Sequence, residues 1–211
     1  MASPDDLLAN AERLISDARH MREHGRTRSA ATLIVVALEQ MGAFVEALTR
    51  QTYPDAEIQM GIFGARANGH AKRQDALAGH VFNFAMGQFM ARAFAEGYIA
   101  EHGSFNADDL VPWLLRTKNY SLTEQQQLDQ RRCSDIATAH LLLHFTRTNV
   151  LKDLRDYGLY EDVTRTFSEA EITQTIELAA KVRIILEKSY VVPEPPKIVG
   201  INMPAGLIID P

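Results

Sequence analysis

The sequence contains a single cysteine, Cys133, so no disulfide can form within the chain. A lone thiol is typical of proteins in a reducing compartment, and we therefore expect a cytoplasmic protein. Long hydrophobic runs are also lacking, because the longest, residues 33–38, is far shorter than the ~20 residues that cross a bilayer. Residues 1–6 are acidic and lack the basic-then-apolar order of a secretion signal. These absences predict a protein that does not insert into a membrane.

A strong excess of positive charge is absent as well. The formal net charge of −5 disfavours broad attraction to nucleic acid but permits a local basic site that binds RNA. The 211 residues, 46% of them apolar and 23% charged, suit one globular domain with a substantial core. We assign this domain to residues 1–190. The prolines of residues 191–211 predict a separate, extended tail.

Apolar residues recur at helical spacing through most of the chain. Start and stop signals then bound the helices. The predicted helices are a first from Ser3-Pro4 to Gly25, a second beginning near Thr27–Ser29, a third from about His70 to Glu101, a short one capped by Asn106, a long stretch from Ser121 to Gly158, and a last one beginning at Ser168. The short link at Gly25 predicts an antiparallel hairpin, and the glycines and proline within residues 53–69 predict a loop.

Two capping boxes mark helix starts, Ser121-Leu-Thr-Glu124 and Ser168-Glu-Ala-Glu171. The first opens the long stretch, which Gly158 is expected to end as a left-handed cap. Some ~35 residues is long for one globular helix, so we expect a kink or break near residues 131–134. Together these signals predict an all-α fold, a bundle of five or six helices.

Three segments of this bundle together resemble a known family. They are residues 10–44 (NAERLISDARHMREHGRTRSAATLIVVALEQMGAF), residues 69–77 (GHAKRQDAL) and residues 151–163 (LKDLRDYGLYEDV). In this order, and at roughly these separations, they resemble the AbiV family of bacterial abortive-infection proteins. That family is part of the HEPN superfamily of helical domains associated with nucleotides or RNA. The resemblance covers about residues 5–190.

Two family elements are kept, His-x-Lys at residues 70–72 and Gly-Leu-Tyr-x-Asp at residues 158–162. A third element departs from the family. Where family members usually have Glu-Glu-x-Gly-Lys, this chain has Glu-Gln-Met-Gly-Ala at residues 39–43. The second acid and the lysine are absent, which argues against a charge pair at this place.

The resemblance implies a HEPN-type bundle that pairs as a homodimer. Many HEPN proteins are ribonucleases that use an Arg and a His separated by four to six residues and need no metal, whereas others have lost the activity. AbiV-like proteins are associated with shutting down translation during phage infection. The resemblance thus implies an antiphage-defence protein that blocks growth or translation. It would act either by engaging a phage or host protein, or as a metal-independent endoribonuclease.

The Arg-x(4–6)-His pattern occurs at three places: Arg13…His20, Arg19…His24 and Arg73…His80. Of these, Arg73 and His80 lie in or beside a family segment and are catalytic candidates. They are seven residues apart on a predicted helix, hence ~10 Å apart along its axis, and the Arg side chain leans away from the His. The pair would therefore need a dimer to meet. The alternative is a solvated Arg and a His at the edge of the core.

His70 is the third catalytic candidate. It lies at the expected start of a helix, where the dipole disfavours imidazolium and favours a ring that can act as a base. Arg73 and Gln74 follow three and four residues later on the same face, whereas Lys72 points elsewhere. A His, cations and helix-start N–H groups suit a phosphate site. The alternative is that His70 caps the helix and hydrogen-bonds a neighbouring carboxylate.

Lys72 and Gln74 are candidates for binding, and so are five further residues. Glu39 lies at the flank of an apolar stripe and is expected to reach a basic residue such as Arg73 or Lys152. The others end the long helix or follow it: Lys152, Arg155, Tyr160 and Asp162. Their alternative roles are structural, with cations suiting a helix end and the Tyr and Asp holding a loop.

Metal binding is not expected. His140 and His144 share a helix face at a spacing compatible with a metal, but no third ligand stands at an obvious position. We predict no metal and no cofactor. Of the two modes of defence, binding of a protein partner is favoured over RNA cleavage, because the net charge is negative and Arg73 is poorly placed toward His80. A structural or regulatory bundle without a defence role is the third alternative.

Overall fold

The computed structural model describes residues 3–52, 69–117, 120–160, 163 and 165–190. These residues contain eight helices and no strand, which confirms the all-α fold. The helices are α1 (Pro4–Glu23), α2 (Thr27–Thr52), α3 (Gly69–His102), α4 (Ala107–Arg116), α5 (Glu124–Arg132), α6 (Ser134–Arg147), α7 (Val150–Leu159) and α8 (Glu169–Tyr190). The predicted tail at 191–211 and the loop, apart from Gly69, lie outside the described residues, so the division at residue 190 stays a prediction.

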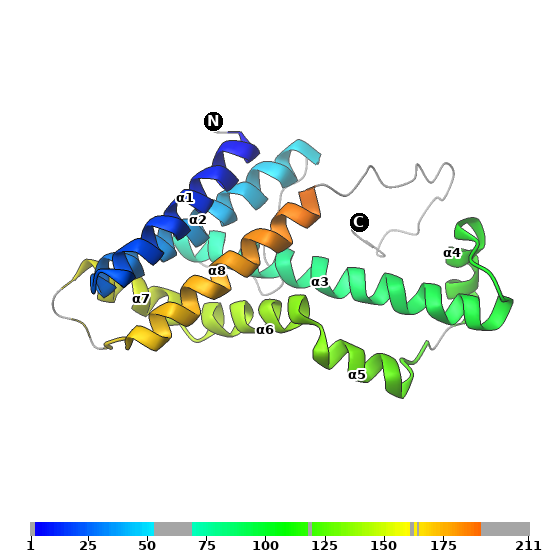
Figure 1. Ribbon diagram of the computed structural model, residues 1–211. Coiled ribbons are helices and arrows are strands. Elements are labelled where there is room, and N and C mark those ends of the chain that lie inside the picture. Colours follow the sequence, from blue (N-terminus) through cyan, green and yellow to red (C-terminus); the bar gives the residue numbers. More distant parts are fainter. Residues whose placement is uncertain (1–2, 53–68, 118–119, 161–162, 164, 191–211) are drawn as a thin grey trace.

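Helix α2 is the centre of the bundle. It packs against α1, α3, α7 and α8, and α1 and α2 form the predicted antiparallel hairpin (Figure 1). Large side chains of α2 such as Ile34, Leu38 and Phe44 are fully buried. Residues 27–51 are long and apolar enough to span a membrane by length and composition, a property that central helices of bundles share, and 56% of the most apolar window is buried inside the protein.

The second half of α3 extends away from this core and carries α4 and α5 near its far end (Figure 1). A buried glutamine of α5, Gln126, fastens α5 to α3. Its amide nitrogen donates to the Ala93 carbonyl at 3.2 Å, and its amide oxygen accepts from the Thr123 N–H at 3.1 Å. Both the nitrogen and the oxygen of this buried amide are therefore bonded within the protein.

Most predicted helix boundaries are confirmed. Ser3 caps α1, Asn106 caps α4, and Ser168 and Glu171 form their capping box at α8. Gly25 and Gly103 end α1 and α3 with left-handed φ values of 72° and 80°, which glycine adopts without strain.

The stretch predicted as one long helix differs most from expectation. Its capping box uses Thr123 and Gln126 instead of Ser121 and Glu124, so the helix begins later. The predicted break occurs at Cys133, but a second break follows at Asn149, whose φ of 61° is left-handed. The stretch is thus α5, α6 and α7, and the described chain has more helices than the five or six expected.

Gly158 does not form the predicted left-handed cap, because it lies inside α7, which ends at Leu159. Its missing side chain serves close packing instead. A Cβ there would lie 2.9 Å from the backbone N of Thr32 and 3.0 Å from the carbonyl oxygen of Arg28, both on α2. Gly42 of α2 has the same role toward α3, since its Cβ would lie 2.6 Å from the carbonyl oxygen of Arg73.

We predict that Gly42→Ala destabilises the protein by about 1–3 kcal/mol, because the added methyl group meets backbone that cannot move without shifting α3. Urea unfolding of the full chain measures the free energy of unfolding. The matched control is Gly87→Ala on the exposed part of α3, where a Cβ meets nothing within 4 Å. Removing that helical glycine should stabilise the protein by about 0.5–1 kcal/mol. Equal effects of the two substitutions would contradict close packing at Gly42.

Candidate functional site

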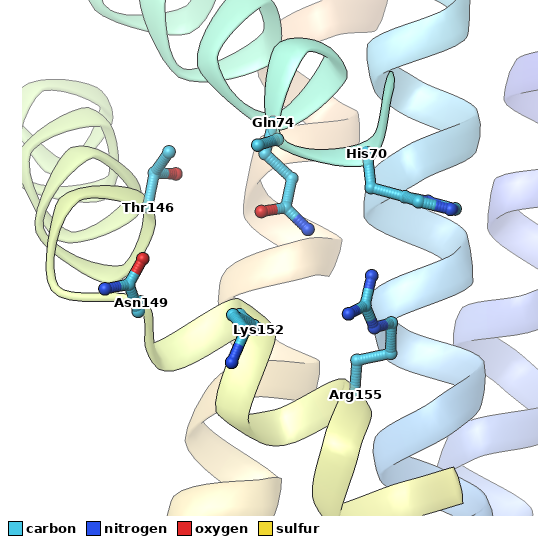
Figure 2. Close-up of a pocket in the computed structure, with 7 residues that line it drawn as sticks. His70, Gln74, Thr146, Asn149, Lys152 and Arg155 are labelled. Atoms are coloured by element: carbon cyan, nitrogen blue, oxygen red, sulfur yellow. The ribbon is translucent and has the colours of Figure 1, made fainter. Parts of the chain in front are cut away.

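A pocket of about 410 Å³ lies between the start of α3 and the junction of α6 with α7. Its lining residues are His70, Ala71, Gln74, Thr146, Asn149, Lys152 and Arg155. Figure 2 shows Gln74 and His70 on α3, with Arg155 extending toward them from α7, the helix that also carries Lys152. The pocket thus joins residues that are about eighty positions apart in the sequence.

Three local features of the backbone create this pocket. The left-handed Asn149 turns the chain between α6 and α7, a conformation that Asn tolerates better than most residues. Gly158 then lets α7 pack closely against α2, and Gly42 lets the start of α3 pack closely against the same helix. The two walls are therefore held at a fixed separation by their contacts with α2.

His70 is hydrogen-bonded to Glu39 of α2, with 2.8 Å between Nδ1 and Oε1. The Glu39 side chain is 11% exposed and that of His70 is 55% exposed. A carboxylate only accepts hydrogen bonds, so Nδ1 carries the hydrogen and Nε2 is the nitrogen that a neutral ring leaves available as a base. The expectation that Glu39 reaches Arg73 or Lys152 is wrong, because its carboxylate is taken by His70.

The alternative role predicted for His70 was a hydrogen bond to a neighbouring carboxylate, and this geometry agrees with it. It is equally the arrangement in which an acid orients a catalytic imidazole. The contact therefore fits both alternatives, and the catalytic role of His70 stays a prediction.

Two cations of α7 face the pocket, and both bond one carboxylate. Lys152 Nζ lies 3.3 Å from Asp156 Oδ2, and Arg155 Nη2 lies 3.2 Å from Asp156 Oδ1. Asp156 itself does not line the pocket. The Arg155 side chain is directed toward the start of α3, near His70 and Gln74 (Figure 2). One shared carboxylate leaves donor groups on both cations for an anion in the pocket.

Gln74 reaches into the same space from the opposite wall. It is only 6% exposed, yet its amide has no hydrogen-bond partner among the residues that the structure describes. Figure 2 shows the amide directed into the pocket, toward the side where Arg155 lies.

The structure does not bring Arg73 and His80 together. Arg73 Nε lies 3.5 Å from Glu46 Oε2 of α2. The Nε2 of His80 lies 3.1 Å from the Ser189 hydroxyl of α8. Since that hydroxyl donates to the Leu186 carbonyl at 2.7 Å, the ring of His80 is the donor. Neither residue lines the pocket, so their use as a pair across a dimer stays a prediction.

The remaining binding candidates lie outside the pocket. Lys72 is exposed on α3. Tyr160 follows α7 with its side chain exposed, and its carbonyl oxygen accepts from Arg28 at 3.1 Å. Asp162 lies outside the described residues. His140 lies against the Phe82 ring, and the described residues hold no group of three or more His, Cys, Asp or Glu that could bind a metal ion.

Sequence reasoning missed Thr146 and Asn149. Thr146 carries no signal, because its hydroxyl donates to the Leu142 carbonyl as in many ordinary helices. Asn149 does carry one. It stands within a stretch too long for one globular helix, and Asn is the residue after Gly that most readily adopts a left-handed conformation.

Comparison with known proteins identifies the chain's relatives. The model of the AbiV family, a family of HEPN domains, matches residues 2–185. This match includes every residue that lines the pocket. No curated protein and no solved structure matches the chain significantly.

Burial lowers the pKa of the His80 imidazole below its ordinary value of 6.5. The unfolded chain therefore binds this proton more readily than the folded protein. The stability that follows from the neutral ring is fully present above pH 6.5 and is lost as the pH falls below that value. We predict that wild type loses more stability than His80→Gln between about pH 8 and about pH 5, measured by urea unfolding. An exposed control, His144→Gln, should follow wild type; identical pH profiles for all three proteins would contradict the prediction.

Proposed function

Because this chain belongs to the AbiV family of abortive-infection proteins within the HEPN superfamily, we propose that it defends bacteria against phage as a metal-independent endoribonuclease. The observation that carries the proposal is the 2.8 Å hydrogen bond between His70 Nδ1 and Glu39. It lies at a pocket that also contains Lys152 and Arg155. An oriented imidazole beside cations supplies what RNA cleavage needs when no metal takes part.

Each group has a role in this chemistry. The neutral His70 Nε2 takes the proton from a ribose 2′-hydroxyl, whose oxygen attacks the adjacent phosphorus. Glu39 holds the ring and stabilises the imidazolium that forms. Arg155 stabilises the negative charge of the phosphorane, and the Lys152 ammonium gives a proton to the departing 5′-oxygen. The products are a 2′,3′-cyclic phosphate and a 5′-hydroxyl.

The hydrogen-bond donors that line the pocket suit the phosphate groups of RNA. The cations Lys152 and Arg155 line the pocket, whereas Asp156, the carboxylate that bonds both of them, does not. The pocket is thus a donor-rich place on a chain of net charge −5. A bound phosphate would replace Asp156 as the partner of both cations, and the positive end of the α3 dipole adds to the attraction. We therefore prefer RNA to the protein partner that the sequence favoured.

Engagement of a phage or host protein is the second candidate. The observation that favours it is a pair of neighbouring apolar side chains at the end of α7, Leu159 and Tyr160, which are 55% and 58% exposed. Large exposed apolar side chains of this kind suit a protein interface.

We also propose that the protein acts in the cytoplasm, where translation takes place, and that it is a homodimer. Light scattering after gel filtration measures the oligomeric state.

We expect the purified protein to cleave total or transfer RNA in the presence of EDTA. His70→Ala should lower the cleavage rate by about 10²–10⁴-fold, because it removes the general base. Arg155→Ala should lower it by about 10²–10³-fold, because it removes charge stabilisation in the transition state. Gel analysis with mapping of the 2′,3′-cyclic ends measures both.

The matched controls are His144→Ala, an exposed histidine outside the pocket, and His80→Gln, which tests the pair across a dimer. The first should cleave like wild type. Loss of cleavage in His80→Gln but not in His70→Ala would move the site to the dimer pair. If no cleavage occurs, even with extract of infected cells, the enzyme proposal fails and the protein-partner candidate replaces it.

A further inference from the structure

Among the residues that the structure describes, two glutamines are almost fully buried, and their surroundings differ completely. Gln126, 7% exposed, bonds the Ala93 carbonyl, the Glu96 carboxylate and the Thr123 backbone N–H. Gln74, 6% exposed, bonds no residue that the structure describes. Buried side-chain amides are almost always hydrogen-bonded, because an unpaired one costs stability. The amide of Gln74 instead opens onto the pocket, where its donor and acceptor are available to a ligand.

The position of Gln74 restricts what that ligand is. Its amide is directed into the pocket from α3, and Arg155 extends toward it from α7 (Figure 2). The pocket volume of about 410 Å³ is in the range of small-ligand sites. A ligand held here contacts an amide on one wall and the cations on the other. It must therefore carry a neutral polar edge and an anionic group.

A carboxamide presents a donor and an acceptor side by side. A phosphate or carboxylate only accepts, so it would satisfy the nitrogen of Gln74 and leave the oxygen unpaired. Adenine satisfies both, because its N6 amino group donates next to the accepting N7, and Gln is a common partner of this edge. Guanine, cytosine and uracil present a donor beside an acceptor on their Watson–Crick edges, whereas adenine presents one there, at N6 and N1, and a second at N6 and N7.

We infer that Gln74 reads an adenine base in this pocket while Arg155 and Lys152 hold the phosphate of the same nucleotide. The inference rests on the proposed function, since it names the nucleotide that the RNA-cleaving site accepts. Gln74 is then a specificity residue: it contacts the base, whereas His70 acts on the ribose and phosphate.

The test is the binding of the four 5′-mononucleotides to the full chain by isothermal titration calorimetry. Adenosine monophosphate should bind about 5- to 150-fold more tightly than the other three, the range for one bidentate contact to a base. Gln74→Met, which keeps the length of the side chain, should reduce its affinity to that of the others. Arg155→Ala should weaken all four nucleotides alike.

The matched control is Gln126→Met, which changes a glutamine of equal burial that already has its partners. It should lower the midpoint of thermal unfolding and keep the adenine preference. Gln74→Met should lose the preference without lowering the midpoint, because no hydrogen bond within the protein is lost. A structural role for Gln74 would instead lower the midpoint.

Equal affinities for all four nucleotides, no binding of any, a preference for another base, or a preference that survives in Gln74→Met each overturn the inference. RNA cleavage without adenine preference leaves the proposed function standing and removes only the role of Gln74. Adenosine monophosphate binding without RNA cleavage removes the nuclease proposal and leaves the adenine site. The two failures are therefore distinguishable.

Discussion

Close packing on one face of α2 fixes the positions of both walls of the pocket and of His70. Thr32, Glu39 and Gly42 are seven and three residues apart, so they lie on the same side of the helix. The first contacts Gly158 of α7, the second holds His70, and the third admits the backbone of α3 at Arg73. One face of α2 thus contacts α7 at one point and α3 at another. Between these two contacts lies the carboxylate that orients the histidine. A shift of either wall would separate the groups that the pocket combines.

The Glu39 carboxylate on that face is more deeply buried than the other carboxylate of α2, that of Glu46. A buried acid needs hydrogen-bonding partners to replace the water that it has lost. His70 is the only residue for which the structure describes such a bond to Glu39. The need to satisfy this carboxylate therefore helps to hold the first turn of α3 against α2, and it orients the imidazole as a consequence.

Much of the fold follows from local signals in the sequence. The cap at Ser3, the stop at Gly25 and the break near Cys133 depend on short stretches of chain, and each is found where those stretches predict it. Gly158 was misread because a glycine that ends a helix and one that lets two helices touch look the same in one sequence. Which of the two it is depends on Thr32, more than a hundred positions away.

In the pocket, too, local signals were predictable from the sequence and contacts between distant residues were not. His70, Gln74, Lys152 and Arg155 were all predicted as candidates from helix starts, helix ends and family segments, but nothing local showed that they meet. The prediction that Glu39 pairs with Arg73 or Lys152 was wrong, because opposite charge alone does not tell one cation from another. The way α3 packs against α2 makes His70 the partner. The break at Asn149, which brings α7 around to face α3, was missed although Asn readily adopts the left-handed conformation found there.

The order of these parts along the chain sets when the pocket can exist during synthesis. The contacts of α1 with α2 join neighbouring segments and can form early, which covers the long, apolar α2 while the ribosome is still at work. Glu39, His70 and Gln74 emerge next, but Lys152 and Arg155 leave the ribosome more than a hundred residues after Glu39. A nascent or prematurely terminated chain therefore has the histidine without the cations. On the proposed function, a bacterium that makes this growth-blocking protein is exposed to its activity only from finished chains.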